Sequence, residues 1–425
     1  MKQLLLIGAG HAHAQVLRDW IDRPVPGVAL RLVSPNALAP YSGMVPGWLA
    51  GQYRFDEICI DFAALAAAAG AVLHLGELAG LDPAAQRVRL ADGTVLGYDC
   101  LSLNVGSTLR PPALPTLARP GAGQGPQGMP LHPQGMPLHP QRMALHPQML
   151  ALRPLGDLHR AWQALLDHPA LIGSRGAAAN AAPAQADAPL HITAVGGGAA
   201  GVESLLAVLA RLRALQPGRL LTSQLVTRAH RLLPGMAPGA VRAAQAALAR
   251  AGVQVLTGTA FDAGSSAGPA TDLVLWAAGA QAHAWQADSG LAVGGGGFIR
   301  IDERLRSVSH PSVLAVGDCA DWWPLDGPAG PPRPPRPLPK AGVFAVRMGP
   351  VLSHNLRATL MGQPLAQYRP QRRFLALLNT ADGHAIASWG ALSVQGRWVW
   401  RWKDRIDRAF LKRFAVAAQG PARGG

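Results

Sequence analysis

The feature that most constrains this chain is a pattern that occurs twice: a short apolar strand, a glycine-rich turn, a helix and a second strand. The first copy spans residues 3–33 and the second spans residues 190–227. A glycine turn between a strand and a helix gathers backbone N–H groups and the positive end of the helix dipole at one point, which suits a pyrophosphate. Two copies predict an α/β fold with two Rossmann-like dinucleotide-binding domains.

The first turn supplies the candidate cofactor-binding residues Gly8, Gly10 and His11. It departs from the full G-x-G-x-x-G pattern, because His13 stands at the third glycine position. Ser34 stands where an acidic residue would hold the adenosine ribose. Taken alone, this motif leaves nucleotide binding and a purely structural turn equally open.

The second turn matches the G-x-G-x-x-G pattern in full, through Gly196, Gly198 and Gly201. A tight structural turn is the alternative, but the upstream copy favours nucleotide binding. The ribose position holds Thr227 rather than an acid, and Arg228 follows it, which tilts the expectation weakly from NADH towards NADPH. A solvated arginine is the competing interpretation of Arg228.

A third segment, residues 312–320, has the pattern of a buried strand that ends in Gly317 and Asp318. An aspartate at that place can accept hydrogen bonds from a ribityl chain. A proline-rich loop follows, and a helix is expected to begin near Gly342 and Val343. The dipole of that helix would stabilise negative charge on a reduced flavin.

Composition narrows the classes of function. The 425 residues are 49% hydrophobic, which allows two or three domains and excludes global disorder. The net charge of +15 predicts attraction to anionic surfaces, but no nucleic-acid-binding motif accompanies it, so nucleic acid is discounted as a partner.

The three cysteines form no CxxC pair, and Cys319 is interpreted as a small buried residue. The lack of a local cysteine pair fits a reducing cytosol, so we expect a cytoplasmic protein. No apolar run is long enough to span a bilayer, so any contact with the inner face of the cell membrane would be peripheral.

Three near-identical heptads, QGMPLHP, QGMPLHP and QRMALHP, occupy residues 127–147. A proline in each repeat forbids a regular helix. Their histidines, His132, His139 and His146, would form a metal tract in one interpretation. A solvent-exposed insert is favoured, because such flexible spacing preorganises no coordination geometry, and no metal site is predicted.

The order of the motifs resembles the pyridine nucleotide-disulfide oxidoreductase superfamily over nearly the whole chain. The resemblance is carried by the first glycine turn and by the segments YDCLSLNVGS (98–107), GGGAAGVE (196–203), DLVLWAAG (272–279), VLAVGDCA (313–320) and PKAGVFAVRMG (339–349). Within the superfamily the chain looks like the branch of type II NADH dehydrogenases and sulfide:quinone oxidoreductases. Further segments resemble a flavoprotein found fused to or beside selenide,water dikinase: GHAHAQVL (10–17), PYSGMVPGWLAGQY (40–53) and parts of the tail 369–414.

The resemblance implies FAD and NAD(P)H as cofactors and assigns the motifs to them. The predicted cofactor-binding residues are Gly8, Gly10, His11, Gly106, Gly317, Asp318, Gly342 and Val343 for FAD, and Gly196, Gly198, Gly201 and Arg228 for the nicotinamide cofactor. The expected domains are an FAD-binding domain at 1–110 and 285–350, a heptad insert at 111–150, an NAD(P)H-binding domain at 151–284, and a C-terminal α+β region at 351–425.

Two residues are predicted to act in catalysis through the resemblance. Glu203 matches a position near the nicotinamide, where it would orient the ring or relay a proton; a glutamate that merely favours the helix dipole is an equal alternative. Lys340 would lie near the flavin pyrimidine edge and favour the anionic reduced form, with an exposed lysine as the alternative. Tyr41, Met44 and Pro46 fall near the flavin in this branch, or serve packing.

The expected reaction is hydride transfer from NAD(P)H to FAD, followed by electron transfer to a quinone or another redox acceptor. Neither a catalytic dithiol nor the cysteine pair of sulfide oxidation is present, so electrons should pass directly through the flavin. One alternative is a flavoenzyme acting on a selenium or sulfur compound in selenophosphate supply, with a functional link to selenide,water dikinase. Another is a flavin-binding sensor without turnover.

The tail alternates tryptophans and then becomes a basic amphipathic helix. Its apolar side is expected to carry Ile406, Phe410, Leu411 and Phe414, with arginines and lysines elsewhere. Such a helix either docks on an anionic membrane surface or packs on the core of its own protein. The sequence favours the two interpretations equally.

Overall fold

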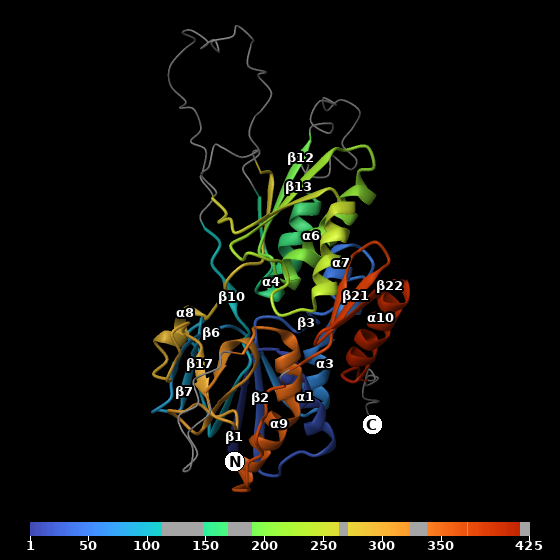
Figure 1. Ribbon diagram of the computed structural model, residues 1–425. Helices are drawn as coiled ribbons and strands as arrows, with labels where there is room; N and C mark the ends of the chain where they lie inside the picture. The colour runs from blue at the N-terminus through green and yellow to red at the C-terminus, as the bar shows by residue number, and fades with distance from the viewer. Residues whose placement is uncertain (113–147, 169–188, 263–270, 324–337, 372, 417–425) are drawn as a thin grey trace, which may run out of the picture.

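The computed structural model of the chain describes residues 1–112, 148–168, 189–262, 271–323, 338–371 and 373–416. The heptads and their three histidines lie outside the described residues. Two sheet-based units lie one above the other in Figure 1, and a C-terminal hairpin and helix lie along one side of them.

The first unit is built on a parallel five-stranded sheet with the order β18-β9-β1-β2-β5. Residues 4–7 of the central strand β1 are almost fully buried, as expected for a strand covered on both faces. Helices α1 and α9 pack against each other beside this sheet (Figure 1). The bounds are β1 Lys2–Ile7, α1 His11–Asp22, β2 Val28–Ser34, β5 Val72–Leu75, β9 Cys100–Leu103, β18 Val313–Ala315 and α9 Gly342–Met361.

Short elements complete the first unit. An antiparallel sheet joins β6, β7 and β8, while β3 pairs with β4 and β17 with β19. The bounds are β3 Leu38–Pro40, α2 Val45–Leu49, β4 Cys59–Asp61, α3 Phe62–Ala68, β6 Leu78–Asp82, β7 Arg87–Leu90, β8 Val95–Gly97, α8 Ala284–Ala287, β17 Ile299–Ile301 and β19 Ala320–Trp322, with 3-10 turns at Asp56–Ile58 and Gly317–Cys319.

The second unit repeats the design with a parallel sheet in the order β11-β15-β12-β13-β14. It is inserted into the first unit, because β18 and α9 rejoin the first unit after it. The segment that leaves the first unit and the segment that returns to it lie side by side, because β10 (Thr108–Leu109) pairs with β16 (Ala280–Gln281). The bounds are β11 Gln148–Ala151, α4 Leu155–Leu166, β12 Leu190–Val195, α6 Ala199–Leu215, β13 Leu221–Thr227, α7 Pro238–Arg250, β14 Val253–Thr257 and β15 Leu273–Trp276.

The predicted fold class, with two Rossmann-like domains and a C-terminal α+β region, is confirmed. The strand, turn and helix of each glycine motif coincide with the predicted elements to within a few residues. The second sheet also takes in β11, which begins at Gln148 and pairs with β15.

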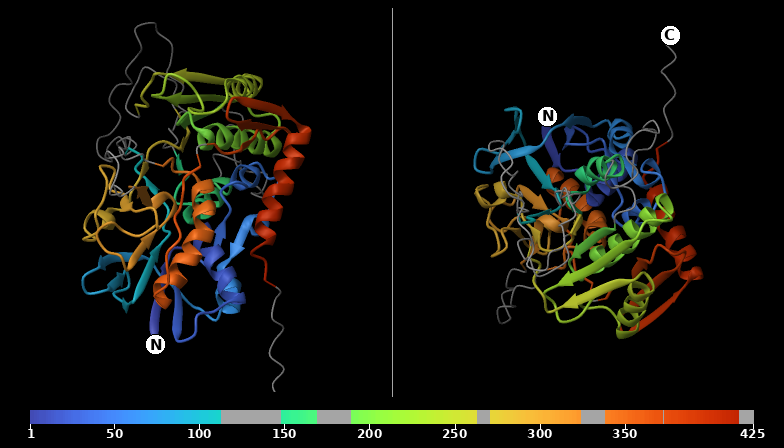
Figure 2. Two further views of the ribbon diagram at one scale, coloured as in Figure 1. Left: turned by 60° about the horizontal axis from the view of Figure 1, so that its bottom comes forward. Right: turned by 90° about the horizontal axis from the view of Figure 1, so that it is seen from above.

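The C-terminal region is an antiparallel sheet of β20 (Ala376–Asn379), β21 (Ala385–Trp389) and β22 (Leu392–Gly396), followed by α10 (Arg397–Lys412). Helix α10 packs on this sheet and runs beside both units (Figure 2). Its contacts with the first unit include a hydrogen bond of 2.7 Å from the Tyr53 hydroxyl to Asp404.

The faces of α10 differ from the predicted ones. Phe410, Leu411 and Phe414 pack on the core, as the packing interpretation requires. The inclusion of Ile406 in that side was wrong, because its side chain is exposed together with Trp398 and Trp402. Tertiary packing thus places one apolar set inward and a second set outward.

His13, at the third glycine position of the first turn, ties that turn to the sheet. Its fully buried ring has Nδ1 2.7 Å from the Gly8 carbonyl oxygen and Nε2 2.8 Å from Ser102 Oγ. Burial lowers the pKa of His13 to about 4, against the opposing effect of the bond to Gly8. A neutral ring therefore donates from Nδ1 to the carbonyl and accepts from the Ser102 hydroxyl.

Titration of His13 should make the stability of the fold depend on pH. The unfolded pKa is 6.5 and the folded pKa is about 4, so the unfolded state binds more protons between these values. The free energy of unfolding should fall as pH is lowered through this window. His13→Gln should weaken that dependence in urea unfolding measured across pH. An unchanged slope in His13→Gln would contradict the neutral buried ring.

Candidate functional site

The first glycine turn lies directly against Asn104, at the carboxyl end of β9. A Cβ atom on Gly10 would lie 2.0 Å from Asn104 Oδ1, and one on Gly8, whose φ is +97°, would lie 2.5 Å from the Asn104 carbonyl oxygen. The Asn104 side chain accepts from the Ala12 N–H at 3.2 Å and donates to the Val316 carbonyl at 3.0 Å. The two glycines are therefore required by packing, and one amide joins the ends of α1, β9 and β18.

The second glycine turn has the same close packing. A Cβ atom on Gly201 would lie 1.9 Å from the Gly196 carbonyl oxygen, while no described residue comes within 4 Å of one on Gly198. Helix α6 begins at this turn without a side-chain cap. Thr227 is buried beside the turn, and Arg228 follows it with an exposed side chain. The turn thus presents an open helix N-terminus with an arginine near it.

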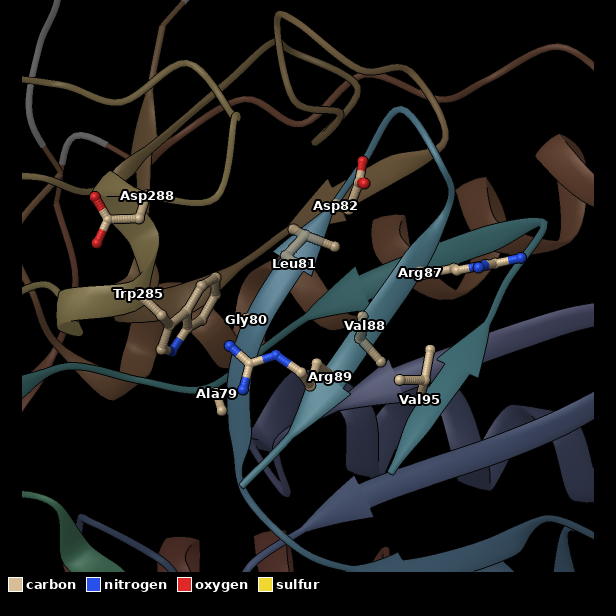
Figure 3. A pocket seen from close by; sticks show the side chains of 10 residues that line it. All are labelled: Ala79, Gly80, Leu81, Asp82, Arg87, Val88, Arg89, Val95, Trp285 and Asp288. Atoms are coloured by element: carbon tan, nitrogen blue, oxygen red, sulfur yellow. The ribbon is translucent and has the colours of Figure 1, made fainter. Parts of the chain in front are cut away.

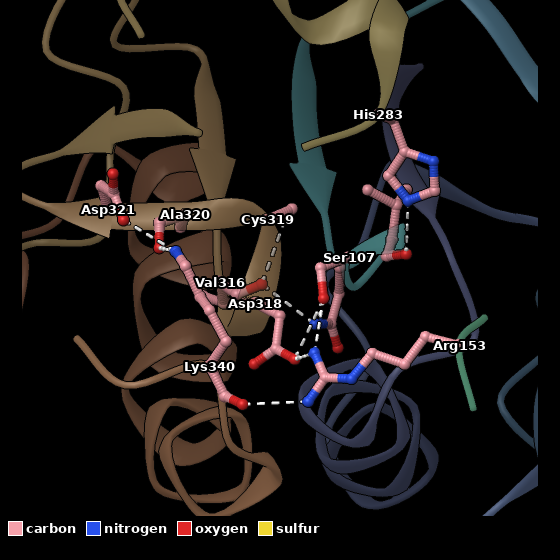
Figure 4. A network of polar contacts seen from close by, with 11 residues as sticks. Ser107, Arg153, His283, Val316, Asp318, Cys319, Ala320, Asp321 and Lys340 are labelled. Carbon is pink, nitrogen blue, oxygen red and sulfur yellow. Dashed lines mark hydrogen bonds and ion pairs between the residues drawn. The ribbon is translucent and has the colours of Figure 1, made fainter. Parts of the chain in front are cut away.

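Asp318 lies beyond the end of β18 in a network shown in Figure 4. Its Oδ2 atom forms an ion pair with Arg153 and lies 3.5 Å from Ser107 Oγ. Gly317 has φ +72° and packs against the Asn104 amide and Ala345 of α9. The predicted ribityl-binding carboxylate therefore stands between the end of the sheet and the start of α9.

The ammonium group of Lys340 is held by neighbours of its own. It donates to Asp321 Oδ1 at 2.7 Å and to the Ala320 carbonyl at 2.8 Å, and it lies 3.6 Å from the centre of the Phe298 ring. Figure 4 shows the side chain extended towards β19. This arrangement overturns the exposed-lysine alternative, because only 14% of the side chain is accessible.

The remaining predicted flavin contacts lie around the same region. Gly342 and Val343 open α9, and a Cβ atom on Gly342 would lie 2.7 Å from Ser42 Oγ. Gly106 has φ +72° with nothing within 4 Å of a built Cβ atom. The segment that contains Tyr41 and Ser42 therefore contacts the start of α9.

His11, the first residue of α1, belongs to an aromatic cluster. Its ring centre is 5.4 Å from that of Tyr41 and 5.9 Å from that of Phe410 in α10. Burial lowers the pKa of His11 to about 4, and its Nε2 atom is buried without a hydrogen-bond partner among the described residues. Met44 is buried in the second core, which supports the packing interpretation for that residue.

Glu203 of α6 lies in a buried group of charges. Its Oε1 accepts from the Asn379 backbone N–H at 2.7 Å. Burial raises the pKa of Glu203 to about 7, while Lys403 and the Asn379 bond oppose this and Asp407 adds to it. The carboxyl group can therefore gain or lose a proton near neutral pH.

Lys403 and Asp407 form a buried ion pair on the inward face of α10. Their side chains are 8% and 6% exposed, and the Lys403 ammonium also donates to the Gly43 carbonyl at 2.6 Å. The Tyr41 hydroxyl donates to Asp407. Because the pair faces Glu203 on one side and residues 41–43 on the other, it connects the two predicted cofactor regions.

The described cavities lie away from these residues. A hollow of about 370 Å³ lies against β6, β7, β8 and Trp285 (Figure 3) and is lined by Ala79, Gly80, Leu81, Asp82, Arg87, Val88, Arg89, Val95, Trp285 and Asp288. Another, of about 300 Å³, lies around Arg250, Asp382 and His384. None of the predicted cofactor-binding residues lines either hollow.

The site residues fit two dinucleotides. Helices α1 and α6 have glycines as N-cap residues. Among the described residues, His11 Nε2 has no hydrogen-bond partner and nothing lies within 4 Å of a Cβ atom built on Gly198. The Ala12 N–H is already bound to Asn104, so it is not available to a phosphate. Within the described ranges, no group of three or more His, Cys, Asp or Glu side chains is arranged to hold a metal ion.

Three residues of this region were missed in the sequence analysis: Asn104, Arg153 and Lys403. Asn104 and Arg153 act on partners far along the chain, so no local pattern marks them. Lys403 had a signal, since Val399, Lys403, Asp407 and Phe410 lie on one helical face. Among the described helices, none is both long and apolar enough to cross a bilayer.

Comparison with known proteins agrees with this architecture. Residues 167–349 match the family described as pyridine nucleotide-disulphide oxidoreductase. The chain is 31% identical over 117 residues to the probable ferredoxin reductase CtmF of Castellaniella defragrans, a match that covers 27% of this chain. It spans only 28% of the length of that relative.

Solved structures share the fold along most of the chain. The sulfide:quinone oxidoreductase of Aquifex aeolicus has a TM-score of 0.67 at 14% identity, with 97% of this chain and 91% of that chain covered. NDH2 of Plasmodium falciparum in complex with NADH has a TM-score of 0.69 at 13% identity, with 97% of each chain covered. The family match covers residues 167–349, and these solved structures share the two-unit fold of the chain.

Proposed function

We propose that the chain is an FAD-dependent oxidoreductase that takes hydride from NAD(P)H and passes the electrons to a quinone or another small acceptor. The observation that carries the proposal is the pair of Rossmann-like units, each with a glycine turn at the N-terminus of a helix whose N-cap residue is a glycine. Two such ends suit the phosphates of two dinucleotides. Asp318 distinguishes the first unit as the flavin side.

In this proposal the FAD-binding domain comprises residues 1–110 and 285–350, and the NAD(P)H-binding domain comprises 151–284 together with β11. When bound, the flavin supplies the centre that accepts the hydride and releases the electrons. The chain binds and orients the two cofactors: Asp318 accepts from the ribityl chain, the start of α9 stabilises negative charge, and Arg228 favours NADPH.

Glu203 and Lys340 have different parts in the proposal. Glu203 holds or releases a proton beside the nicotinamide, because its pKa lies near neutrality. Lys340 acts through its positive charge, since its ammonium is already bound to Asp321 and the Ala320 carbonyl. The free cysteines Cys59, Cys100 and Cys319 take no part, and burial raises the pKa of Cys319 to about 11.

The acceptor is the less defined half of the proposal. Among the similar proteins, one is a quinone oxidoreductase and one a probable ferredoxin reductase, so a quinone or a small redox protein is the partner we propose. A functional link to selenide,water dikinase, with a selenium or sulfur compound as substrate, stays a prediction from the sequence resemblance.

We also propose that α10 contacts an anionic membrane surface. Trp398 and Trp402 are 56% and 39% exposed and their rings stack at 6.2 Å, and Leu392 of β22 is also exposed. Arg401 and Arg405 are exposed on the same helix. Tryptophans flanked by arginines are typical of a helix that lies at a lipid interface, and such a position suits access to a quinone.

Reduction of bound flavin tests the main proposal. Purified protein titrated anaerobically with NADPH, and separately with NADH, should lose its flavin absorption band, with the faster loss for NADPH. Arg228→Ala should reduce the preference for NADPH by about tenfold, the scale of one charged hydrogen bond. Bound flavin that neither nicotinamide reduces would contradict the dehydrogenase and favour a sensor or a selenium or sulfur substrate.

The pKa of Glu203 should move in opposite directions in two variants. Lys403→Met removes a positive charge and should raise it, while Asp407→Asn removes a negative charge and should lower it. The infrared band of the protonated carboxyl group, identified by its loss in Glu203→Gln, can be followed across pH. Lys412→Met, an exposed change on the same helix, should leave the pKa where it is. Shifts in one common direction would refute the assigned charge interactions.

Membrane contact is tested by co-sedimentation with lipid vesicles. The protein should bind vesicles rich in phosphatidylglycerol more than vesicles of phosphatidylcholine, and less so as salt is raised. Replacement of Trp398 and Trp402 by serine should reduce binding about tenfold or more, because each loses a large apolar area. Leu220→Ser, another exposed apolar position, is the matched control. Equal binding by the tryptophan variant would rule out this surface.

A further inference from the structure

Arg153 follows β11 of the second unit and precedes α4, yet its guanidinium group reaches into the first unit. It forms an ion pair with Asp318, donates to Ser107 Oγ, and donates to the Lys340 carbonyl at 3.0 Å. Figure 4 shows these three bonds converging on one side chain. A single residue of the second unit therefore holds three separate segments of the first.

The three segments are those that surround the proposed flavin contacts. Ser107 follows β9, Asp318 follows β18, and Lys340 lies just before α9. Their sequence separations from Arg153 are 46, 165 and 187 residues, so no local structure holds them together. The guanidinium plane, with its fixed fork of donors, can set the distance between the Asp318 carboxylate and the start of α9.

The Oδ1 atom of Asp318 can still accept a hydrogen bond from a ligand. The hydrogen bonds and the ion pair that its carboxylate forms with the described residues all use Oδ2. The Asp318 and Arg153 side chains are 14% and 27% exposed, so water screens the pair less than it screens a surface ion pair. With Oδ2 held by a cation, Oδ1 can accept a hydroxyl hydrogen from a ligand.

The ammonium group of Lys340 does not contact the Asp318 carboxylate. Its ammonium is directed to Asp321 and the Ala320 carbonyl, and only its backbone oxygen enters the network. Among the described residues, the cation in contact with Asp318 is therefore Arg153. We propose that Arg153 is a positioning residue for the flavin: it orients the Asp318 carboxylate and the backbone before α9 for the ribityl chain. This inference rests on the proposed FAD site.

FAD affinity of the apoprotein, measured by quenching of flavin fluorescence, tests the inference. Arg153→Met should weaken FAD binding about tenfold or more, the scale of a lost charged hydrogen bond. Arg153→Lys should recover part of the affinity, because the charge is kept and the fork is lost. Arg160→Met, an exposed arginine of α4 paired with Asp157, should bind FAD like the unchanged protein. Unchanged affinity in Arg153→Met would overturn the inference.

A double-mutant cycle separates positioning from general support of the fold. If Arg153 acts through Asp318, the variant with both Arg153→Met and Asp318→Asn should bind FAD about as weakly as Asp318→Asn alone. Additive losses would overturn that route of action. Should Arg153→Met fail to fold, the same cycle with Arg153→Lys gives the answer. An unchanged protein that binds no FAD would refute the proposed function instead, so the two failures are distinguishable.

Discussion

The contact between the first glycine turn and Asn104 is the constraint on which the proposed flavin region depends. The turn approaches Asn104 so closely that no side chain fits at Gly8 or Gly10. The same amide binds the Val316 carbonyl, two residues before Asp318. Because one side chain joins α1, β9 and β18, the position of the Asp318 backbone follows from the position of the turn. A change at Asn104 would therefore alter both sides of the region at once.

Local patterns were enough to predict the fold. Each apolar strand, glycine turn and following helix occupies a short stretch of the chain, so its pattern is decided by neighbours in the sequence. Asn104 and Arg153 could not be found in this way, because their roles come from partners that β9, β18 and α9 bring together only in the folded chain. His13 lies between these cases: its departure from the glycine pattern was visible, but its bonds to Gly8 and Ser102 were not.

In helix α10 the position of Lys403 differs from the one that the sequence pattern predicts. Charged residues are usually solvated, so the sequence pattern predicts that the lysines of this helix, Lys403 among them, lie away from its apolar side. The ion pair with Asp407 reverses this, because two opposite charges at i and i+4 can enter a core together when further bonds satisfy them. The Gly43 carbonyl and the Tyr41 hydroxyl supply those bonds. Their directionality sets the rotation of the helix about its axis, and that rotation leaves Trp398 and Trp402 outside.

Arg153 and Lys403 reach the first unit from different parts of the chain and use the same chemistry. Each combines a carboxylate, partly buried in Asp318 and buried in Asp407, with a backbone carbonyl, that of Lys340 or that of Gly43. Removing both charges of such a pair from water is costly unless their geometry is good. Each pair therefore adds little to the free energy of unfolding, but it fixes the position of the segments that it joins. The two carbonyls belong to segments that contact each other where Ser42 approaches Gly342 at the start of α9. In the proposed function, a flavin held beside Asp318 and the start of α9 depends on the contacts that Arg153 brings from the second unit, so flavin binding and the docking of the second unit should reinforce each other.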